Sequence, residues 1–243
     1  MRTLLISDVH ANLPALDAVL KDAGEYDRVW CLGDIVGYGP DPNACIDRIA
    51  DLPGLICVKG NHDAAILGEI DLKTFNEEAR TSIYWLESQL GPSQRQWLAN
   101  LPERLVIDGV TLAHGSPRNP VWEYILDLST ARANMKHFDT QVCLVGHTHV
   151  AGIFQMPGEN SLVPRHFFMV ENEPMTLEKK CIVNPGSVGQ PRDRDPRAAY
   201  MVYDDESAHW TFYRVAYDIT QVQERIFSAG LPRLHANRLA GGW

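Results

Sequence analysis

Apolar segments that each end in polar, metal-ligating side chains are the feature that most constrains the fold of this chain. Five short motifs of this kind occur before position 150, and each follows a segment with the composition of a buried strand. In an open α/β sheet, ligands bind beyond the carboxyl ends of the strands, so motifs distant in sequence converge there. The candidate metal ligands in these motifs are Asp8, His10, Asp34, Asn61, His114, His147 and His149.

The ligand types indicate which metals such a site would hold. Carboxylate, imidazole and amide oxygen, without thiolate, suit divalent Mn, Fe, Zn or Ni. Asp8 and His10 are two residues apart, so an extended backbone would direct both side chains to the same side. One aspartate can bridge two cations about 3.5–4 Å apart, and Asp34 is the natural bridge because its motif offers no second ligand. The sequence therefore predicts two divalent metal ions, with manganese expected first and iron, zinc or nickel as alternatives.

Each motif taken alone has a purely structural interpretation. An isolated Asp-x-His or Gly-Asp pair is usually a turn or a helix cap, and His114 alone would fit a buried structural histidine. The segments 60–63 and 146–149 could be ordinary turns. The metal-site prediction depends on all the motifs occurring together, in this order, each at the end of a strand.

The pattern of apolar residues predicts an α/β chain of mixed α+β character. Expected strands at residues 2–7, 28–32 and 55–59 alternate with helices, which implies parallel pairing, whereas residues 64–102 have helical periodicity only. An Asp108-Gly109 pair predicts a two-residue hairpin. We expect further strands at 141–145, 150–156, 167–170, 181–183, 199–203 and 210–215, and a last helix at 218–229.

These elements predict a single domain over residues 1–230 with a helical insert at about 64–102. Residues 231–243 are expected to form a C-terminal tail that is loose or packs on a partner.

Composition excludes several other classes of protein. A net charge of −9 argues against extended nucleic-acid binding, which requires a basic face. No segment has the roughly 18 apolar residues of a membrane span, and the N-terminus lacks a signal-peptide core, so we expect a cytoplasmic protein without membrane contact. The sequence is compatible with a homo-oligomer as well as with a monomer. Buried, unpaired thiols are expected for Cys31, Cys57, Cys143 and Cys181.

The five motifs between positions 8 and 149 resemble those of the calcineurin-like metallophosphoesterase superfamily. The matching blocks are Asp8-Val9-His10, Gly33-Asp34, Gly60-Asn61-His62-Asp63, His114 and Gly146-His147-Thr148-His149. Asn12 and the Asn184-Pro185-Gly186-Ser187 segment are similar to the bacterial phosphodiesterase branch and extend the resemblance to about position 190.

The resemblance implies a four-layer α/β/β/α sandwich with two metals at the sheet edges. It assigns one metal to Asp8, His10, Asp34 and His149, and the other to Asp34, Asn61, His114 and His147. A metal-bridging hydroxide would attack phosphorus in line, and His62 would stabilise the transition state or protonate the leaving oxygen, with Asp63 orienting its ring. Asn12, Asn184 and Ser187 are expected to support the ligands from behind.

The chain departs from the Ser/Thr protein phosphatases after the bridging aspartate. Those enzymes have a phosphate-binding arginine at the position that Tyr38 occupies here. We expect Arg118, Arg192 and Arg194 as substitute phosphate-binding residues, with surface ion pairs to Asp193 or Asp195 as the alternative. His235 is interpreted as a surface or structural histidine, and Trp122 and Tyr124 as core residues.

The function expected from these features is metal-dependent hydrolysis of small phosphodiesters, with phosphomonoesters as secondary substrates. A phosphoprotein phosphatase or a dinucleoside polyphosphate hydrolase is the alternative within the same chemistry. A non-catalytic protein-binding scaffold is the alternative from another class.

Overall fold

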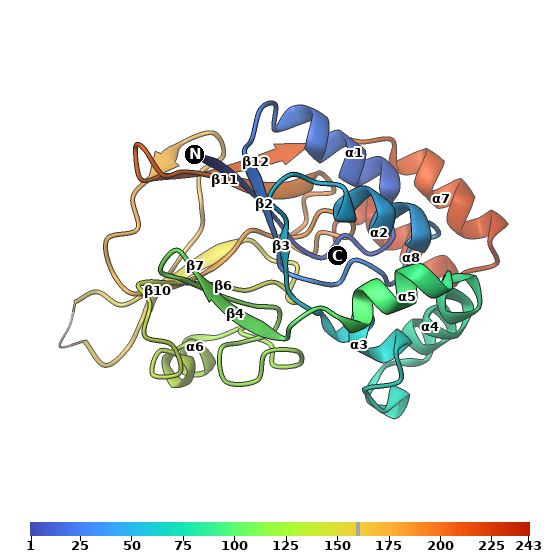
Figure 1. The fold of residues 1–243 in the computed structure, drawn as a ribbon, viewed down its shortest axis with the longest axis horizontal. Coiled ribbons are helices and arrows are strands. Elements are labelled where there is room, and N and C mark those ends of the chain that lie inside the picture. Colours follow the sequence, from blue (N-terminus) through green and yellow to red (C-terminus); the bar gives the residue numbers. More distant parts are fainter. Residues whose placement is uncertain (159–160) are drawn as a thin grey trace.

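The computed structural model describes residues 1–158 and 161–243 and arranges them in four layers (Figure 1). Two mixed six-stranded sheets lie face to face between helices. Figure 1 shows α1 (Leu13–Asp22) and α2 (Pro42–Ala50) above the first sheet, and α6 (Leu128–Asn134) below the second. The predicted α/β/β/α sandwich is confirmed.

The first sheet has the order β3-β2-β1-β11-β12-β9. Its first three strands pair in parallel, as predicted, with Leu5 opposite Trp30 and Trp30 opposite Ile56. The strands are β1 (Arg2–Ile6), β2 (Arg28–Cys31), β3 (Ile56–Cys57), β11 (Ala198–Asp204), β12 (His209–Val215) and β9 (Pro174–Met175).

The second sheet has the order β4-β5-β6-β10-β7-β8. The predicted hairpin at its edge is confirmed: Asp108 and Gly109 both have positive φ, as a type I′ turn requires. The strand expected at 167–170 instead ends at Phe167. The strands are β4 (Arg104–Ile107), β5 (Val110–Ala113), β6 (Val142–Leu144), β10 (Cys181–Asn184), β7 (Gly152–Gln155) and β8 (Arg165–Phe167).

Alternation of side chains along the strands creates the separate cores between the layers. On β1, Leu4 and Ile6 pack with residues of α1 and α2, whereas Leu5 packs in the core between the two sheets. Cys143 on β6 points outward to the cluster under α6. All five cysteines are buried and unpaired.

Residues 64–102 contain only helical elements and connections, as predicted. The elements are the end of α3 (Asn61–Ile66), a 3₁₀ turn (Leu72–Thr74), α4 (Glu77–Gln89) and α5 (Pro92–Ala99). The interpretation of this segment as an insert in a single domain stays a prediction. Across the described residues, no helix combines the length and apolarity needed to cross a bilayer.

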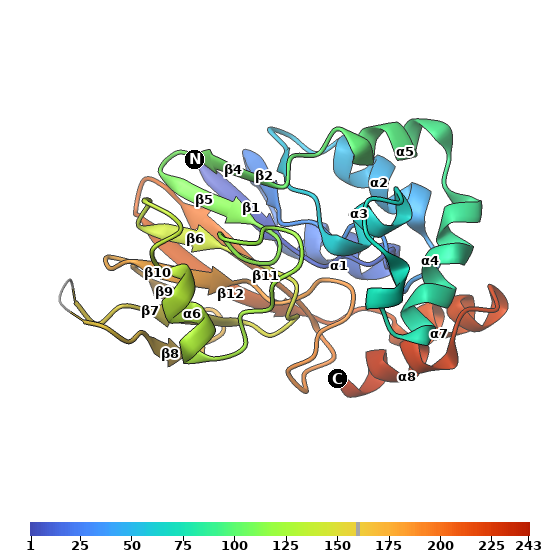
Figure 2. The same ribbon diagram turned by 90° about the horizontal axis from the view of Figure 1, so that it is seen from below.

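The C-terminal residues form a helix that packs on the preceding one, so the expectation of a loose tail is wrong, and packing on a partner stays a prediction. The helix α7 (Ile219–Ser228) is followed by Gly230, whose φ is 71°. The chain then forms α8 (Arg233–Gly241). Leu239 of α8 is buried in one cluster with Val222 of α7, and the two helices lie side by side in Figure 2. The helix was missed because Pro232 and the Gly241-Gly242 pair gave the segment the composition of a loop.

Candidate metal centre

The predicted ligands meet beyond the strand ends, where two groups of side chains share one residue. Asp8, His10, Asp34 and His149 form one group, and Asp34, His114 and His147 form the other, with ligand atoms that lie within 4.8 Å of one another in each group. Asn61 joins the second group, because its Oδ1 lies 3.1 Å from Nε2 of His114.

Asp34 lies between the two groups. Its Oδ2 atom is 3.6 Å from Nε2 of His10 in the first group and 3.3 Å from Nε2 of His114 in the second. Its other oxygen, Oδ1, accepts a hydrogen bond from the backbone N–H of His62 at 2.8 Å. One carboxylate is therefore placed to bridge two cations.

The backbone at the centre is strained, with five ligand residues in the left-handed region. The values of φ are 54° for Asp8, 50° for His10, 53° for Asp34, 65° for His147 and 60° for His149. The expectation that Asp8 and His10 share a side through extended geometry is therefore wrong: a left-handed turn after β1 brings them together. Such strain persists only where surrounding structure enforces it, and it is typical of functional sites.

Three of the histidines are oriented by hydrogen bonds to backbone carbonyls on their outer side. His114 and His149 donate from Nδ1 at 2.8 and 2.6 Å, and His147 donates from Nε2 at 3.1 Å. The accepting carbonyls belong to Leu32, Gln190 and Trp122 respectively. Each bond fixes the tautomer, so the inner nitrogen presents a lone pair to the centre, as a metal ligand must.

The inner nitrogens face one another at short distances. Nε2 of His10 lies 3.0 Å from Nε2 of His149, and Nε2 of His114 lies 3.1 Å from Nδ1 of His147. Two ring nitrogens this close are stable only when a proton or a metal ion lies between them, because facing lone pairs repel each other. This arrangement fits two bound metal ions.

The titration behaviour of the buried groups fits the same conclusion. Burial lowers the pKa of His10 and His149, so their rings are neutral, as metal ligands require. Burial alone would raise the pKa of Asp8, but His149, His114 and the Ser7 hydroxyl together lower it to about 2. Burial alone would lower the pKa of His114, but Asp34, Asp8 and the Leu32 carbonyl together raise it to about 9, so a metal ion at this nitrogen would displace a proton. The centre attracts positive charge.

The three residues that were predicted to support the metal ligands, Asn12, Asn184 and Ser187, form hydrogen bonds with the loops around those ligands. Ser187 donates to the backbone carbonyl of Asp8 at 2.8 Å, and Asn184 donates to that of Gly146 at 2.6 Å. Asn12 accepts from the first turn of α1 and donates to the carbonyl of Gly189 at 2.9 Å. The three bonds to backbone carbonyls tie the ligand loops to neighbouring segments.

His62 lies beside the ligands, but Asp63 does not orient its ring, so that prediction is wrong. The Asp63 carboxylate accepts hydrogen bonds from the backbone N–H groups of Asp34 (2.8 Å) and Gly60 (2.9 Å). It also accepts from Ile35 and Val36 at 3.0 and 3.2 Å. Asp63 therefore holds the backbone around the shared carboxylate.

The partner of the His62 ring is Tyr38. Nε2 of His62 lies 3.0 Å from the Tyr38 hydroxyl, and the buried Nδ1 of His62 has no hydrogen-bond partner among the described residues. Burial lowers the pKa of His62 to about 4. The Arg192 guanidinium donates to the same hydroxyl at 3.2 Å, so the structure brings this predicted arginine to the centre.

The other two predicted arginines have different environments. Arg118 is paired with Glu123, to which its Nε donates at 2.9 and 3.0 Å, so an ion pair forms there, although with a partner that was not expected. The Arg194 side chain is exposed, and its backbone N–H donates to Gly242 at 2.7 Å. The structure does not place either guanidinium on a ligand residue.

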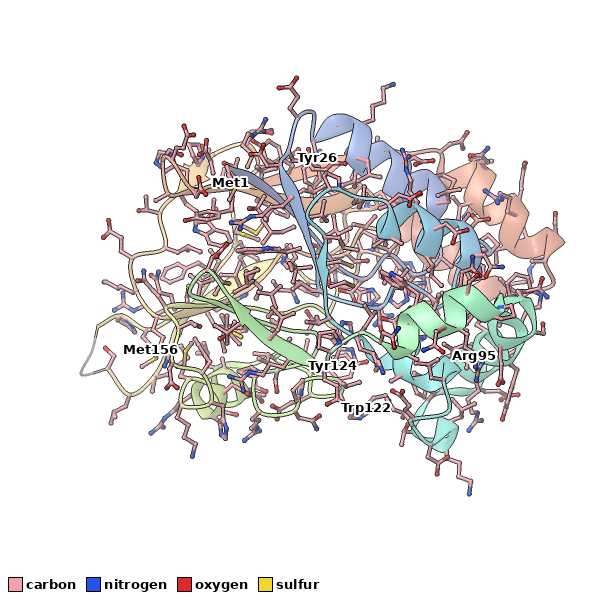
Figure 3. All side chains as sticks on the ribbon, in the orientation of Figure 1. Met1, Tyr26, Arg95, Trp122, Tyr124 and Met156 are labelled. Atoms are coloured by element: carbon pink, nitrogen blue, oxygen red, sulfur yellow. The ribbon has the colours of Figure 1, made fainter. Side chains whose placement is uncertain are left out.

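Sequence reasoning assigned three residues at the centre to other roles. The Tyr124 ring stacks on His147 with 3.6 Å between centroids, and the side chain is 42% exposed. Trp122 is its neighbour at the boundary between the second sheet and the helical segment (Figure 3). His235 of α8 is 1% exposed and packs against Tyr38 with 4.6 Å between centroids. No motif marks any of them.

A four-layer sandwich whose strand ends carry two Asp/His groups with a shared carboxylate defines the metallophosphoesterase class. The sequence model described as the calcineurin-like phosphoesterase superfamily domain matches residues 1–207, and the chain belongs to this superfamily. The protein is accordingly a metal-dependent phosphoester hydrolase of a family that uses two metal ions.

Several relatives are similar along most of the chain. A metallophosphoesterase structure from Sphaerobacter thermophilus is 45% identical, covers 100% of this chain and 99% of its own, and has a TM-score of 0.89. An uncharacterized protein of Methanocaldococcus jannaschii is 35% identical, over 97% of this chain and 96% of its own length. A symmetrical bis(5'-nucleosyl)-tetraphosphatase of Glaesserella parasuis is 24% identical, over 66% of this chain and 58% of its own length.

Proposed function

We propose that this protein hydrolyses small phosphodiesters with two divalent metal ions, manganese first and iron, zinc or nickel as alternatives. One metal is held by Asp8, His10, Asp34 and His149, and the other by Asp34, Asn61, His114 and His147. The observation that carries the proposal is the position of Asp34 between two buried groups of ligands whose inner nitrogens face each other.

Retention of all seven ligands argues against a non-catalytic scaffold. Five buried, unpaired thiols support a cytoplasmic location.

Two bound divalent ions would activate water and neutralise charge on the phosphoryl group. The chain's own residues would do the rest. Asp63 holds the backbone of the shared carboxylate, and three histidines are fixed in the ligand tautomer by carbonyl acceptors. His62 would donate to the leaving oxygen, and Arg192 would bind a non-bridging phosphate oxygen.

The guanidinium of Arg192, which donates to the Tyr38 hydroxyl beside His62, supports a diester substrate. A phosphodiester has one negative charge, whereas a monoester has up to two, so one arginine matches the diester better. The similarity to bis(5'-nucleosyl)-tetraphosphatases favours a dinucleoside polyphosphate as the second candidate. This chain has Tyr38 at the position of the phosphate-binding arginine of Ser/Thr protein phosphatases, which argues against a phosphoprotein substrate.

Arg192→Ala is expected to raise the KM for a phosphodiester about tenfold or more, because a charge-assisted hydrogen bond to phosphate is lost. Arg118→Ala is the matched control, since Arg118 is already engaged by Glu123, and it should change KM less than twofold. Steady-state kinetics on both variants checks this. Equal effects of the two substitutions would contradict the assignment of Arg192.

The substrate class is tested by steady-state kinetics of the metal-loaded protein. The substrates are bis(p-nitrophenyl) phosphate, p-nitrophenyl phosphate and a dinucleoside tetraphosphate. We expect the diester to exceed the tetraphosphate at least about a hundredfold in kcat/KM, a difference of about 2.7 kcal/mol. The reverse order would replace the diester by the tetraphosphate. A folded, metal-loaded protein without turnover of any of them from about pH 5 to pH 9 would contradict the proposal.

A further inference from the structure

The Tyr124 ring contacts a candidate metal ligand and is at the same time open to solvent. It stacks on the His147 ring, with 3.6 Å between the centroids and 20° between the planes. The residue is nevertheless 42% exposed, whereas a residue of the core would be buried. Because the imidazole covers one face of the ring, the exposed area lies on the opposite face and on the ring edge. Tyr124 therefore presents a free aromatic face beside the metal centre.

The segment around Tyr124 is anchored on both sides, which holds the ring in this place. The Glu123 carboxylate accepts hydrogen bonds from the Ser116 hydroxyl at 2.7 Å and from the Asn134 amide at 2.8 Å. Ile125 is buried in the cluster under α6. Both sequence neighbours of Tyr124 therefore point into the protein. A ring that is fixed in advance loses little conformational entropy when a ligand binds to it.

Trp122 extends this aromatic surface towards the helical segment. Its backbone carbonyl lies 3.1 Å from Nε2 of His147, and its ring packs edge to face against Phe75, with 5.0 Å between the centroids. Figure 3 shows Trp122 and Tyr124 close to the boundary between the second sheet and the helical segment. Leu126, two residues beyond Tyr124, is 65% exposed. The surface beside the second ligand group is therefore aromatic and apolar, and it suits a part of the substrate other than its phosphate.

The geometry favours a planar group on this surface over an alkyl chain. A ring that stacks on a flat imidazole with one face can stack on a second flat ring with the other. Every nucleobase has such a face, and stacking on aromatic side chains is a common way in which proteins bind bases. In a nucleoside 5'-phosphate, the ribose separates the base from phosphorus by only a few bonds. A phosphate at the metal centre would therefore leave the base within reach of Tyr124.

We propose that Tyr124 is a substrate-binding residue whose free face stacks on a nucleobase, so that the phosphodiester substrate carries a nucleoside. This inference rests on the proposed hydrolysis of phosphodiesters and names the substrate class of that site. It requires the aromatic ring of residue 124 and not its hydroxyl. Phenylalanine should therefore preserve the contact with the nucleoside, whereas leucine, which is apolar but not planar, should not.

The experiment compares three p-nitrophenyl phosphodiesters whose second alcohol is thymidine, joined through its 5' oxygen, ethanol or octanol. All three release p-nitrophenolate, so differences in kcat/KM depend on the retained alcohol. In the wild type, we expect the thymidine ester to exceed the ethyl ester at least about tenfold. Tyr124→Leu should reduce this ratio to less than about threefold, and Tyr124→Phe should retain it.

The ratio is the decisive quantity because Tyr124 also stacks on His147. A disturbed metal centre lowers the rates of all three esters together, and this effect cancels in the ratio. Tyr84→Leu is the matched control, because it removes another exposed tyrosine ring, on α4, and it should leave the ratio unchanged.

Three results would overturn the inference while the proposed function stands. The first is a thymidine ester no better than the ethyl ester in the wild type. The second is an octyl ester as good as the thymidine ester, which would indicate a general apolar surface. The third is a ratio that Tyr124→Leu leaves at the wild-type value.

A binding measurement on the wild type needs no turnover and also covers the case in which Tyr124→Leu loses metal. The ligands are the phosphonate analogues of AMP and of ribose 5-phosphate, in which a methylene group replaces the ester oxygen and prevents hydrolysis. In calorimetry of the manganese-loaded protein, we expect the AMP analogue to bind at least about tenfold more tightly. Equal dissociation constants would overturn the inference even for an active enzyme. Tighter binding of the AMP analogue by a protein without turnover would contradict the proposed hydrolysis and retain the nucleobase contact.

Discussion

Asp34→Asn is expected to remove at least one of the two metal ions and to lower kcat/KM for a phosphodiester about a thousandfold, equivalent to about 4 kcal/mol. The reason is the position of Oδ2, which lies 3.6 Å from Nε2 of His10 and 3.3 Å from Nε2 of His114. An amide has one oxygen and no charge, so it cannot bridge two cations. Its oxygen can still accept the bond from the His62 N–H, so the loop should be retained. Elemental analysis and steady-state kinetics on the same sample check both effects.

Asp17→Asn is the matched control, because that carboxylate lies on the surface, where it pairs with Arg48. It should retain two metals and full activity. If Asp34→Asn also retained two metals and activity within about threefold of the wild type, Asp34 would not be the bridging ligand.

His62→Ala is expected to lower kcat between about a hundredfold and a thousandfold while the metal content stays unchanged, the range for loss of a catalytic acid. The ring lies beside the ligands, with 4.9 Å between its centroid and that of His10, but it is bonded to Tyr38 instead of facing a ligand group. Its backbone N–H to Asp34 does not depend on the side chain. The loss should therefore fall on kcat and spare metal binding.

Kinetics and elemental analysis separate the alternatives for His62. A fully active His62→Ala variant would remove this residue from the mechanism. A variant that loses metal would give His62 a structural role in the centre instead.

The ligand positions could be predicted because their signal is local. Asp34, His114 and His147 each stand directly after an apolar strand, and parallel or sheet-neighbouring strands bring their ends together without further information. The layers could be predicted for the same reason, because side chains alternate along a strand such as β1, so that every second residue faces the same layer. Backbone detail was less accessible, as the left-handed turn at Asp8 and His10 shows.

The surroundings of His62 could not be predicted because they depend on long-range packing. Asp63 is adjacent to His62 in sequence, yet the helical turn of α3 directs its carboxylate to the N–H groups after β2. Arg192 and His235 are distant from Tyr38 in sequence, and only the tertiary fold brings them into contact with it. The spacing of residues in the sequence does not indicate contacts between side chains so far apart along the chain.

The proposed mechanism requires two metal ions bound around Asp34 for phosphodiester hydrolysis. Its most direct test is a titration of metal-free protein with Mn²⁺, with turnover of bis(p-nitrophenyl) phosphate measured at each addition. We expect turnover to rise with each addition and to saturate when two ions are bound per chain. Turnover that saturates at one ion, that is full without metal, or that never appears would contradict it.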